Sequence, residues 1–103
     1  MTKSRSETFV GFAIKSGKCK IGTGAVETLR RAELVIVCNT ASENTKKQAK
    51  KLANRLNAKL YTTVNKTLSQ ITFKENSKMM AILDLALANA IMSAEDGEFA
   101  SLE

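Results

Sequence analysis

The segment LVIVCNTASENTKKQAKKLANRL, residues 34–56, places a strand pattern directly before a helix pattern. Residues 34–38 form a continuous apolar run rich in β-branched side chains, which is typical of a strand buried on both faces of a sheet. Thr40 and Glu43 have the spacing of a capping box and predict the start of the longest helix. A buried strand followed by a helix that covers it therefore forms the centre of the predicted fold.

The predicted helix is amphipathic, with small and apolar residues on one side and basic residues over the rest. The inner side comprises Ala41, Thr45, Ala49, Leu52, Ala53 and Leu56. The outer side comprises Lys46, Lys47, Lys50, Lys51 and Arg55. A basic outer face of this kind is more often a solvated surface than a binding surface.

Strand and helix patterns alternate on both sides of this segment. Upstream, Ser4 and Glu7 predict a capped helix that ends at Gly17, followed by a strand over 18–21 and a helix over 25–32. Downstream, the patterns predict strands over 59–64 and 79–83, a short helix over 66–72, and a last helix capped by Asp84. This alternation is typical of a sheet covered on both faces. The predicted fold class is α/β, a three-layer α/β/α sandwich around a central mixed sheet of about four strands.

The sequence contains no proline and no linker rich in glycine and serine, so it predicts one domain over residues 1–94. Residues 95–103 change composition and form an acidic tail that we expect to fray. The alternative is that Phe99 or Leu102 docks back on the domain. The acidic residues of the tail are Glu95, Asp96, Glu98 and Glu103.

The charge balance favours a polyanionic partner. The whole chain carries +6, and without the four acidic residues of the tail, sixteen basic residues face six acidic ones, which leaves +10. Such a domain attracts phosphates and releases their counterions on binding, as nucleic-acid-binding proteins do. The alternative is a lysine-rich surface that serves solubility alone.

The sequence offers little for catalysis. It has no histidine, and Cys19 and Cys38, its two cysteines, do not form a C-x-x-C pair, so we expect no enzyme, no metal and no cofactor. The one candidate nucleophile is Cys19, whose neighbours Lys18 and Lys20 would lower a thiol pKa. No apolar run approaches the ~20 residues of a membrane span, and the first residues do not form a secretory signal. We expect a cytoplasmic protein with no membrane partner and no small-molecule substrate.

Gly22-Thr23-Gly24 lies between a predicted strand and a predicted helix. It matches only the opening of a dinucleotide-binding fingerprint, because Glu27 stands where the third glycine belongs. A glycine turn before a helix directs free backbone N–H groups at a docked phosphate. The basic residues on either side are Lys15, Lys18, Lys20, Arg30 and Arg31. These residues predict an RNA-phosphate cradle, and the alternative is a tight turn that merely needs glycine.

Two stretches, VGFAIKSGKCKIGTGAVETLRRAELVIVCNTASENTKKQAKKLA (residues 10–53) and MMAILDLALANAIM (residues 79–92), resemble the kink-turn RNA-binding ribosomal protein superfamily of L-seven-Ae and L-thirty-e. They are most similar to its small bacterial branch, and the resemblance covers about residues 7–93. It implies an α/β/α sandwich that recognises a sharply bent internal loop of RNA.

The resemblance also implies which residues touch RNA. The turn before the second helix would contact tandem G·A pairs, and the loop over 74–78 would close over an extruded base. The strong binders of this superfamily have Asn-Glu after Gly-Thr and a lysine three residues later, where this chain has Gly24, Ala25 and Thr28. The predicted RNA-binding set is Lys15, Lys18, Lys20, Gly22, Thr23, Gly24, Ala25, Thr28, Arg31, Asn76, Ser77 and Lys78.

The predicted function is non-catalytic binding of structured RNA, kink-turn-like or ribosomal, as an accessory protein of the ribosome or another ribonucleoprotein. The alternative is a protein–protein interaction module of the same fold that has lost specific RNA binding. The replacements at Gly24, Ala25 and Thr28 favour the alternative, in which the acidic tail would imitate RNA. The sequence leaves the oligomeric state open.

Overall fold

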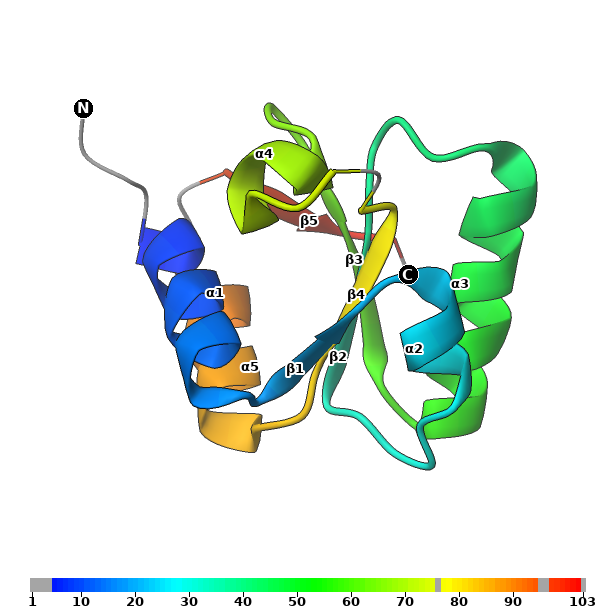
Figure 1. Cartoon of the computed structure of the whole chain (residues 1–103), viewed down its shortest axis with the longest axis horizontal. Helices are drawn as coiled ribbons and strands as arrows, with labels where there is room; N and C mark the ends of the chain where they lie inside the picture. Colours follow the sequence, from blue (N-terminus) through cyan, green and yellow to red (C-terminus); the bar gives the residue numbers. More distant parts are fainter. Residues whose placement is uncertain (1–4, 76, 95–96, 103) are drawn as a thin grey trace.

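The computed structural model of the chain describes residues 5–75, 77–94 and 97–102. Within them, one mixed sheet has five strands in the order β1-β4-β2-β3-β5, and β2 lies at its centre (Figure 1). Strand β2 pairs with β3 in parallel and with β4 antiparallel, while β1 and β5 are antiparallel edge strands. The strands are β1 (Cys19–Ile21), β2 (Leu34–Val37), β3 (Lys59–Thr63), β4 (Met79–Ile82) and β5 (Phe99–Ser101).

Helices cover both faces of the sheet, which confirms the predicted three layers (Figure 1). One face carries α1 (Arg5–Ser16), α4 (Leu68–Thr72) and α5 (Leu85–Ser93), and the other carries α2 (Thr23–Glu27) and α3 (Glu43–Leu56). Every residue of β2 and β4 is buried, because both strands have helices on both sides. Among the described residues, no helix has the length and apolar composition that crossing a membrane requires.

The C-terminal residues form a strand, so the prediction of a frayed tail is wrong for residues 99–101. Strand β5 pairs with β3, and the Val64 and Leu102 N–H groups donate to the Glu98 and Leu60 carbonyls at 3.1 Å. Phe99 is half-buried against the core, which is the docking considered as the alternative. The sheet therefore has one strand more than expected. Glu95, Asp96 and Glu103 of the predicted tail lie outside the described residues.

The ends of several helices differ from the prediction. Ser42, and not Thr40, caps α3, and its hydroxyl oxygen accepts from the Thr45 N–H at 3.2 Å. Helix α2 ends at Glu27, well before the predicted residue 32, so it is only five residues long. Leu85 is 58% exposed because it stands in the first turn of α5, directly after the cap.

Asp84 caps α5 as predicted. One carboxylate oxygen accepts from the Leu87 N–H at 2.9 Å, and the other accepts from the Lys18 ammonium at 3.1 Å. The hydrogen bond from the Leu87 N–H, followed by the bond from Lys18, lowers the pKa of Asp84 below its usual range. The charged carboxylate is therefore the form that stabilises the junction of β1, β4 and α5.

We predict that Asp84→Asn removes part of the acid sensitivity of folding. A carboxyl whose pKa is lowered in the folded state contributes stability above its unfolded pKa of about 4, and this contribution is lost as the pH falls through the folded pKa. Asparagine still caps the helix but has no charge. The difference in melting temperature between wild type and variant should therefore shrink as the pH falls from about 7 to about 3. A difference that stays constant over this range would contradict the prediction.

Candidate nucleic-acid interface

The predicted RNA-binding residues divide between two ends of the sheet. At one end, which we call the turn end, the Gly22 N–H donates to the Met79 carbonyl at 2.8 Å. At the opposite end, the Leu83 N–H donates to the Lys18 carbonyl at 2.9 Å. Met79 begins β4 and Leu83 directly follows it, so the two ends are separated by about 13 Å along the strand.

The turn itself depends on one glycine. Gly22 precedes α2 with φ +104° and ψ 144°, a conformation that essentially only glycine adopts. Because α2 has only five residues, its dipole gives little of the anion attraction expected from the sequence. The Thr28 hydroxyl donates to the Ala25 carbonyl at 2.8 Å and so serves the end of α2. Any affinity for phosphate at this end must come from side chains nearby.

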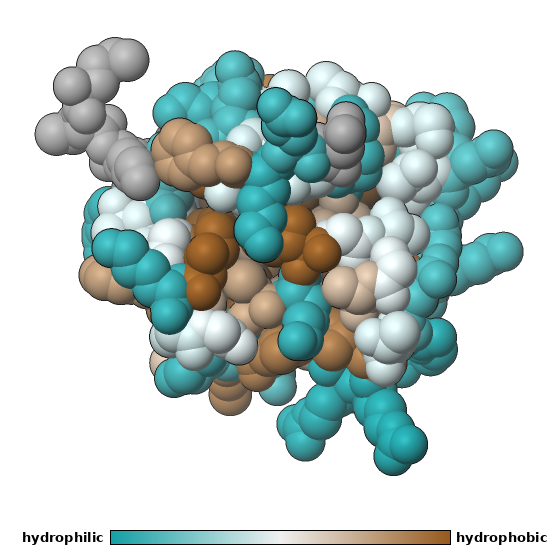
Figure 2. Space-filling model, viewed as in Figure 1, coloured by the Kyte–Doolittle hydropathy of each residue, from teal (hydrophilic) through white to brown (hydrophobic). Residues whose placement is uncertain are grey.

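Beside the turn, an open pocket of about 290 Å³ extends across the edge strand β1, and we call it the groove. Its lining residues are Ile14, Cys19, Lys20, Ile21, Ala25 and Lys74. On the face of the molecule that carries β1, apolar side chains gather in the middle and long hydrophilic side chains cross them (Figure 2). The groove is therefore lined by both apolar side chains and two lysines.

Lys74 is a member of this site that the predicted set lacks. It follows α4, far from Lys20 in the sequence, and both ammonium groups act on Cys19. Only the strand order brings them together, because β4 lies beside β1 and the segment before β4 therefore ends at the turn. The pattern along the chain does not settle strand order.

The pKa of Cys19 differs from the expectation, and the two thiols shift in opposite directions. Burial raises the pKa of Cys19, although Lys74 and Lys20 oppose the shift, so this thiol stays protonated at neutral pH. Burial would also raise the pKa of Cys38, but hydrogen bonds from Thr40 and from the Leu68 N–H, at 3.1 and 3.3 Å, lower it below its usual value. Cys38 is 1% exposed and so lies inside the core.

The segment between α4 and β4 has both buried and exposed members. Ser77 is 3% exposed, and its hydroxyl donates to the Lys74 carbonyl at 2.8 Å, so the structure contradicts its assignment as a surface contact. Lys78 is exposed, and its ammonium donates to the Thr40 hydroxyl at 3.2 Å. Asn76, also predicted to bind RNA, lies outside the described residues.

Phe73 is a second residue that the predicted set lacks. It ends α4 with φ +59°, a left-handed conformation that an aromatic residue rarely adopts, and it is 76% exposed. It directly precedes Lys74, which lines the groove. Exposed aromatic rings close to basic residues are common where unstacked bases bind.

Three predicted residues lie away from the turn. Lys18 pairs with Asp84 at the opposite end, and Lys15 belongs to the last turn of α1, just before it. Arg31 follows α2 and lies near Glu33, with 3.7 Å between the guanidinium and the carboxylate. The predicted phosphate cradle at the turn therefore does not include Lys15, Lys18 or Arg31.

Residues 5–75, 77–94 and 97–102 contain no cluster of three or more histidine, cysteine, aspartate or glutamate side chains that could hold a metal ion. No protein-family model matches the chain, and no curated protein matches it significantly.

We predict opposite effects for alanine at the two glycines of the turn. Gly22→Ala should lower the free energy of unfolding by about 1–3 kcal/mol, because alanine is strained at this φ although its Cβ would meet no atom within 4 Å. Gly24→Ala, also unobstructed and without a positive φ, should leave it unchanged or raise it by up to about 1 kcal/mol. Urea unfolding measures both, and equal effects would show that the backbone of the turn is not constrained as described.

Proposed function

We propose that this protein binds structured RNA without catalysing a reaction, as an accessory component of the ribosome or of another ribonucleoprotein. The observation that carries the proposal is the groove, where Lys20 and Lys74 line one pocket together with apolar side chains, beside a glycine turn. Lysine ammonium groups bind backbone phosphates, and apolar side chains beside them can contact a ribose or the face of a base. Phe73 and Lys78 extend this surface along the segment before β4.

Each part of this surface has a role in the proposal. Lys20 and Lys74 would neutralise two phosphates, and Lys78 would approach a third from the start of β4. Gly22 and Gly24 leave space for the RNA backbone to come close to the protein backbone, since a Cβ at either position would meet open space. Phe73 would stack on one unpaired base, because every base offers a face to an aromatic ring.

The resemblance to the kink-turn superfamily supports RNA as the partner and an unpaired, bent segment as the target. The residues that depart from the superfamily's motif determine which parts of the RNA this chain can contact. Gly24 and Ala25 offer purine edges no side-chain donors or acceptors, and Thr28 bonds its own helix. We therefore propose recognition through backbone shape and stacking, with less base reading than in the Asn-Glu proteins.

A protein–protein module is the second candidate, and one observation favours it. Phe12 and Leu85 are 55% and 58% exposed and belong to α1 and α5, which pack against each other in the layer opposite α2 and α3. Exposed apolar side chains in one layer are suited to burial against a partner. Light scattering after size-exclusion chromatography tests this reading, since a stable oligomer that resists salt and carries no nucleic acid would favour it.

We predict that Lys20→Gln combined with Lys74→Gln lowers affinity for structured RNA about tenfold at low salt. The slope of log affinity against log salt should become shallower by about two, one for each lost phosphate contact. Fluorescence polarisation at several salt concentrations measures both quantities. The matched control is Arg5→Gln combined with Lys15→Gln, which removes two charges from α1 and should change the slope little.

The same titration compares a kink-turn RNA with a plain duplex of equal length. Tighter binding to the kink-turn that persists at higher salt would support structure-specific recognition. Equal binding to both that disappears with salt would show non-specific attraction alone, and the protein–protein reading would then lead.

We predict that Phe73→Gly separates RNA binding from stability. Glycine relieves the left-handed conformation at the end of α4, so the free energy of unfolding should stay unchanged or rise by up to about 1 kcal/mol. Loss of base stacking should weaken binding of an RNA with an unpaired base by about 1–3 kcal/mol. Phe73→Tyr keeps the ring and should keep the affinity. Undiminished affinity in Phe73→Gly would remove stacking from the proposal.

A further inference from the structure

A second pocket, of about 230 Å³, lies at the opposite end of the sheet, and the described residues that line it include three arginines. Arg30 and Arg31 come from the segment between α2 and β2, and Arg55 comes from the last turn of α3. We call this the arginine pocket. Its remaining lining residues are Ala32, Glu33, Leu56 and Asn57.

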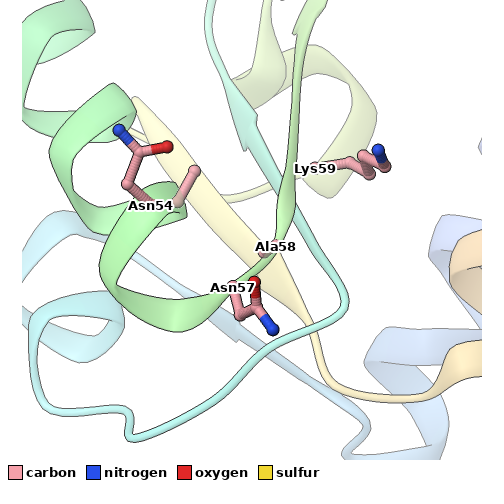
Figure 3. Close-up of a pocket in the computed structure, with 5 residues that line it drawn as sticks. Asn54, Asn57, Ala58 and Lys59 are labelled. Atoms are coloured by element: carbon pink, nitrogen blue, oxygen red, sulfur yellow. The ribbon is translucent and has the colours of Figure 1, made fainter.

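Asn57 also belongs to an adjoining pocket of about 280 Å³ behind the end of α3. Figure 3 shows the Asn57 amide directed toward the segment between α2 and β2, whereas the Lys59 side chain points away from it. The polar wall of the arginine pocket is therefore continued by an amide donor, while Lys59 is not part of it.

The arginines are held to different degrees. The Arg55 guanidinium donates to the Glu27 and Leu29 carbonyls at 2.7 and 3.2 Å, which fixes its position and leaves its remaining N–H groups for another acceptor. The Arg31 side chain is 87% exposed. Arg30 makes no hydrogen bond or ion pair with any residue that the structure describes.

The pocket carries more positive charge than the structural role of its arginines explains. Arg55 has a structural explanation, because it ties α3 to the end of α2 and complements the helix dipole. Arg30 and Arg31 have none of comparable strength, and Glu33 is the only carboxylate among the described lining residues. Guanidinium groups bind phosphate oxygens through paired N–H donors, so a phosphate is the anion that suits this pocket.

A row of cations leads from the turn end to the arginine pocket. Lys47, Lys51 and Arg55 are spaced four residues apart on one side of α3, which places successive charges about 6 Å apart along the helix. Helix α3 extends from the turn end to the opposite end of the sheet, alongside α2 (Figure 1). A partner with regularly repeated negative charge, such as a nucleic-acid backbone, fits this row better than a single small anion.

We propose that Arg30, Arg31 and Arg55 form a second phosphate-binding site, which holds an RNA backbone segment other than the one at the groove. The choice of RNA rests on the proposed function, while binding of phosphate by the pocket does not depend on the groove. The protein would then hold two segments of one folded RNA, one at the groove and one at the arginine pocket.

The first experiment uses inorganic pyrophosphate and two-dimensional ¹H–¹⁵N NMR spectra of the intact chain at low salt. The backbone amides of residues 28–33 and 55–57 should shift in a saturable way. Arg30→Gln combined with Arg31→Gln should abolish these shifts, and Arg30→Lys with Arg31→Lys, which keeps the charge, should weaken them because lysine lacks the paired donors. Shifts spread evenly over all basic segments, or equal responses of the lysine variant and the wild type, would overturn the site.

The second experiment measures structured RNA binding by the same variants. The glutamine variant should bind about tenfold more weakly at low salt, with a salt slope shallower by about two. Unchanged RNA binding would overturn RNA as the ligand of the second site, whatever the groove variant Lys20→Gln with Lys74→Gln does. Loss of binding in the arginine variant alone would support the second site and count against the groove. A polyglutamate peptide that competes as well as RNA would overturn the choice of RNA in favour of an acidic protein.

Discussion

The complete burial of β2 is the constraint on which the rest of the structure depends. A strand buried on both faces must have every backbone N–H and carbonyl paired within the sheet, because water cannot reach them. Strands β3 and β4 supply that pairing, one parallel and one antiparallel. Helix α3 serves as the crossover between β2 and β3, and Ser42 caps its start a short turn after β2 ends at Val37. One apolar run therefore determines both neighbours of the central strand and the helix beside them.

The antiparallel placement of β4 decides where the candidate interface lies. Because β4 starts at the end where β1 finishes, the segment before β4 meets the glycine turn, and the Gly22 N–H bonds to the first residue of the strand. Phe73, Lys74 and Lys78 come to this end for the same reason, although none of them is near Gly22 in the sequence. Ser77 is buried there because its hydrogen bonds hold the segment in shape. In this segment, the residues exposed on the surface are therefore different from the residue that holds the segment in place.

Sequence patterns were sufficient for the alternation of elements, the buried strands and the Asp84 cap, because each depends on residues close together in the chain. They were insufficient where the outcome depends on strand order or on competition between local signals. Ser42 and Thr40 both suit a cap, and Thr40 instead bonds Cys38 and Lys78. Residues 99–101 read as part of an acidic tail, yet β3 has a free edge that they cover. Lys74 and Phe73 were missed because nothing in the local pattern shows that they lie beside Lys20.

The shortness of α2 changes where the positive charge of the molecule is useful. With five residues, α2 ends early, and the chain between it and β2 carries Arg30 and Arg31 to the opposite end of the sheet. A helix through residue 32, as the sequence suggested, would have kept them on a helical surface. The excess charge is consequently divided between the groove and the arginine pocket. Net charge indicates how much phosphate a chain can neutralise, and the topology decides at how many places it does so.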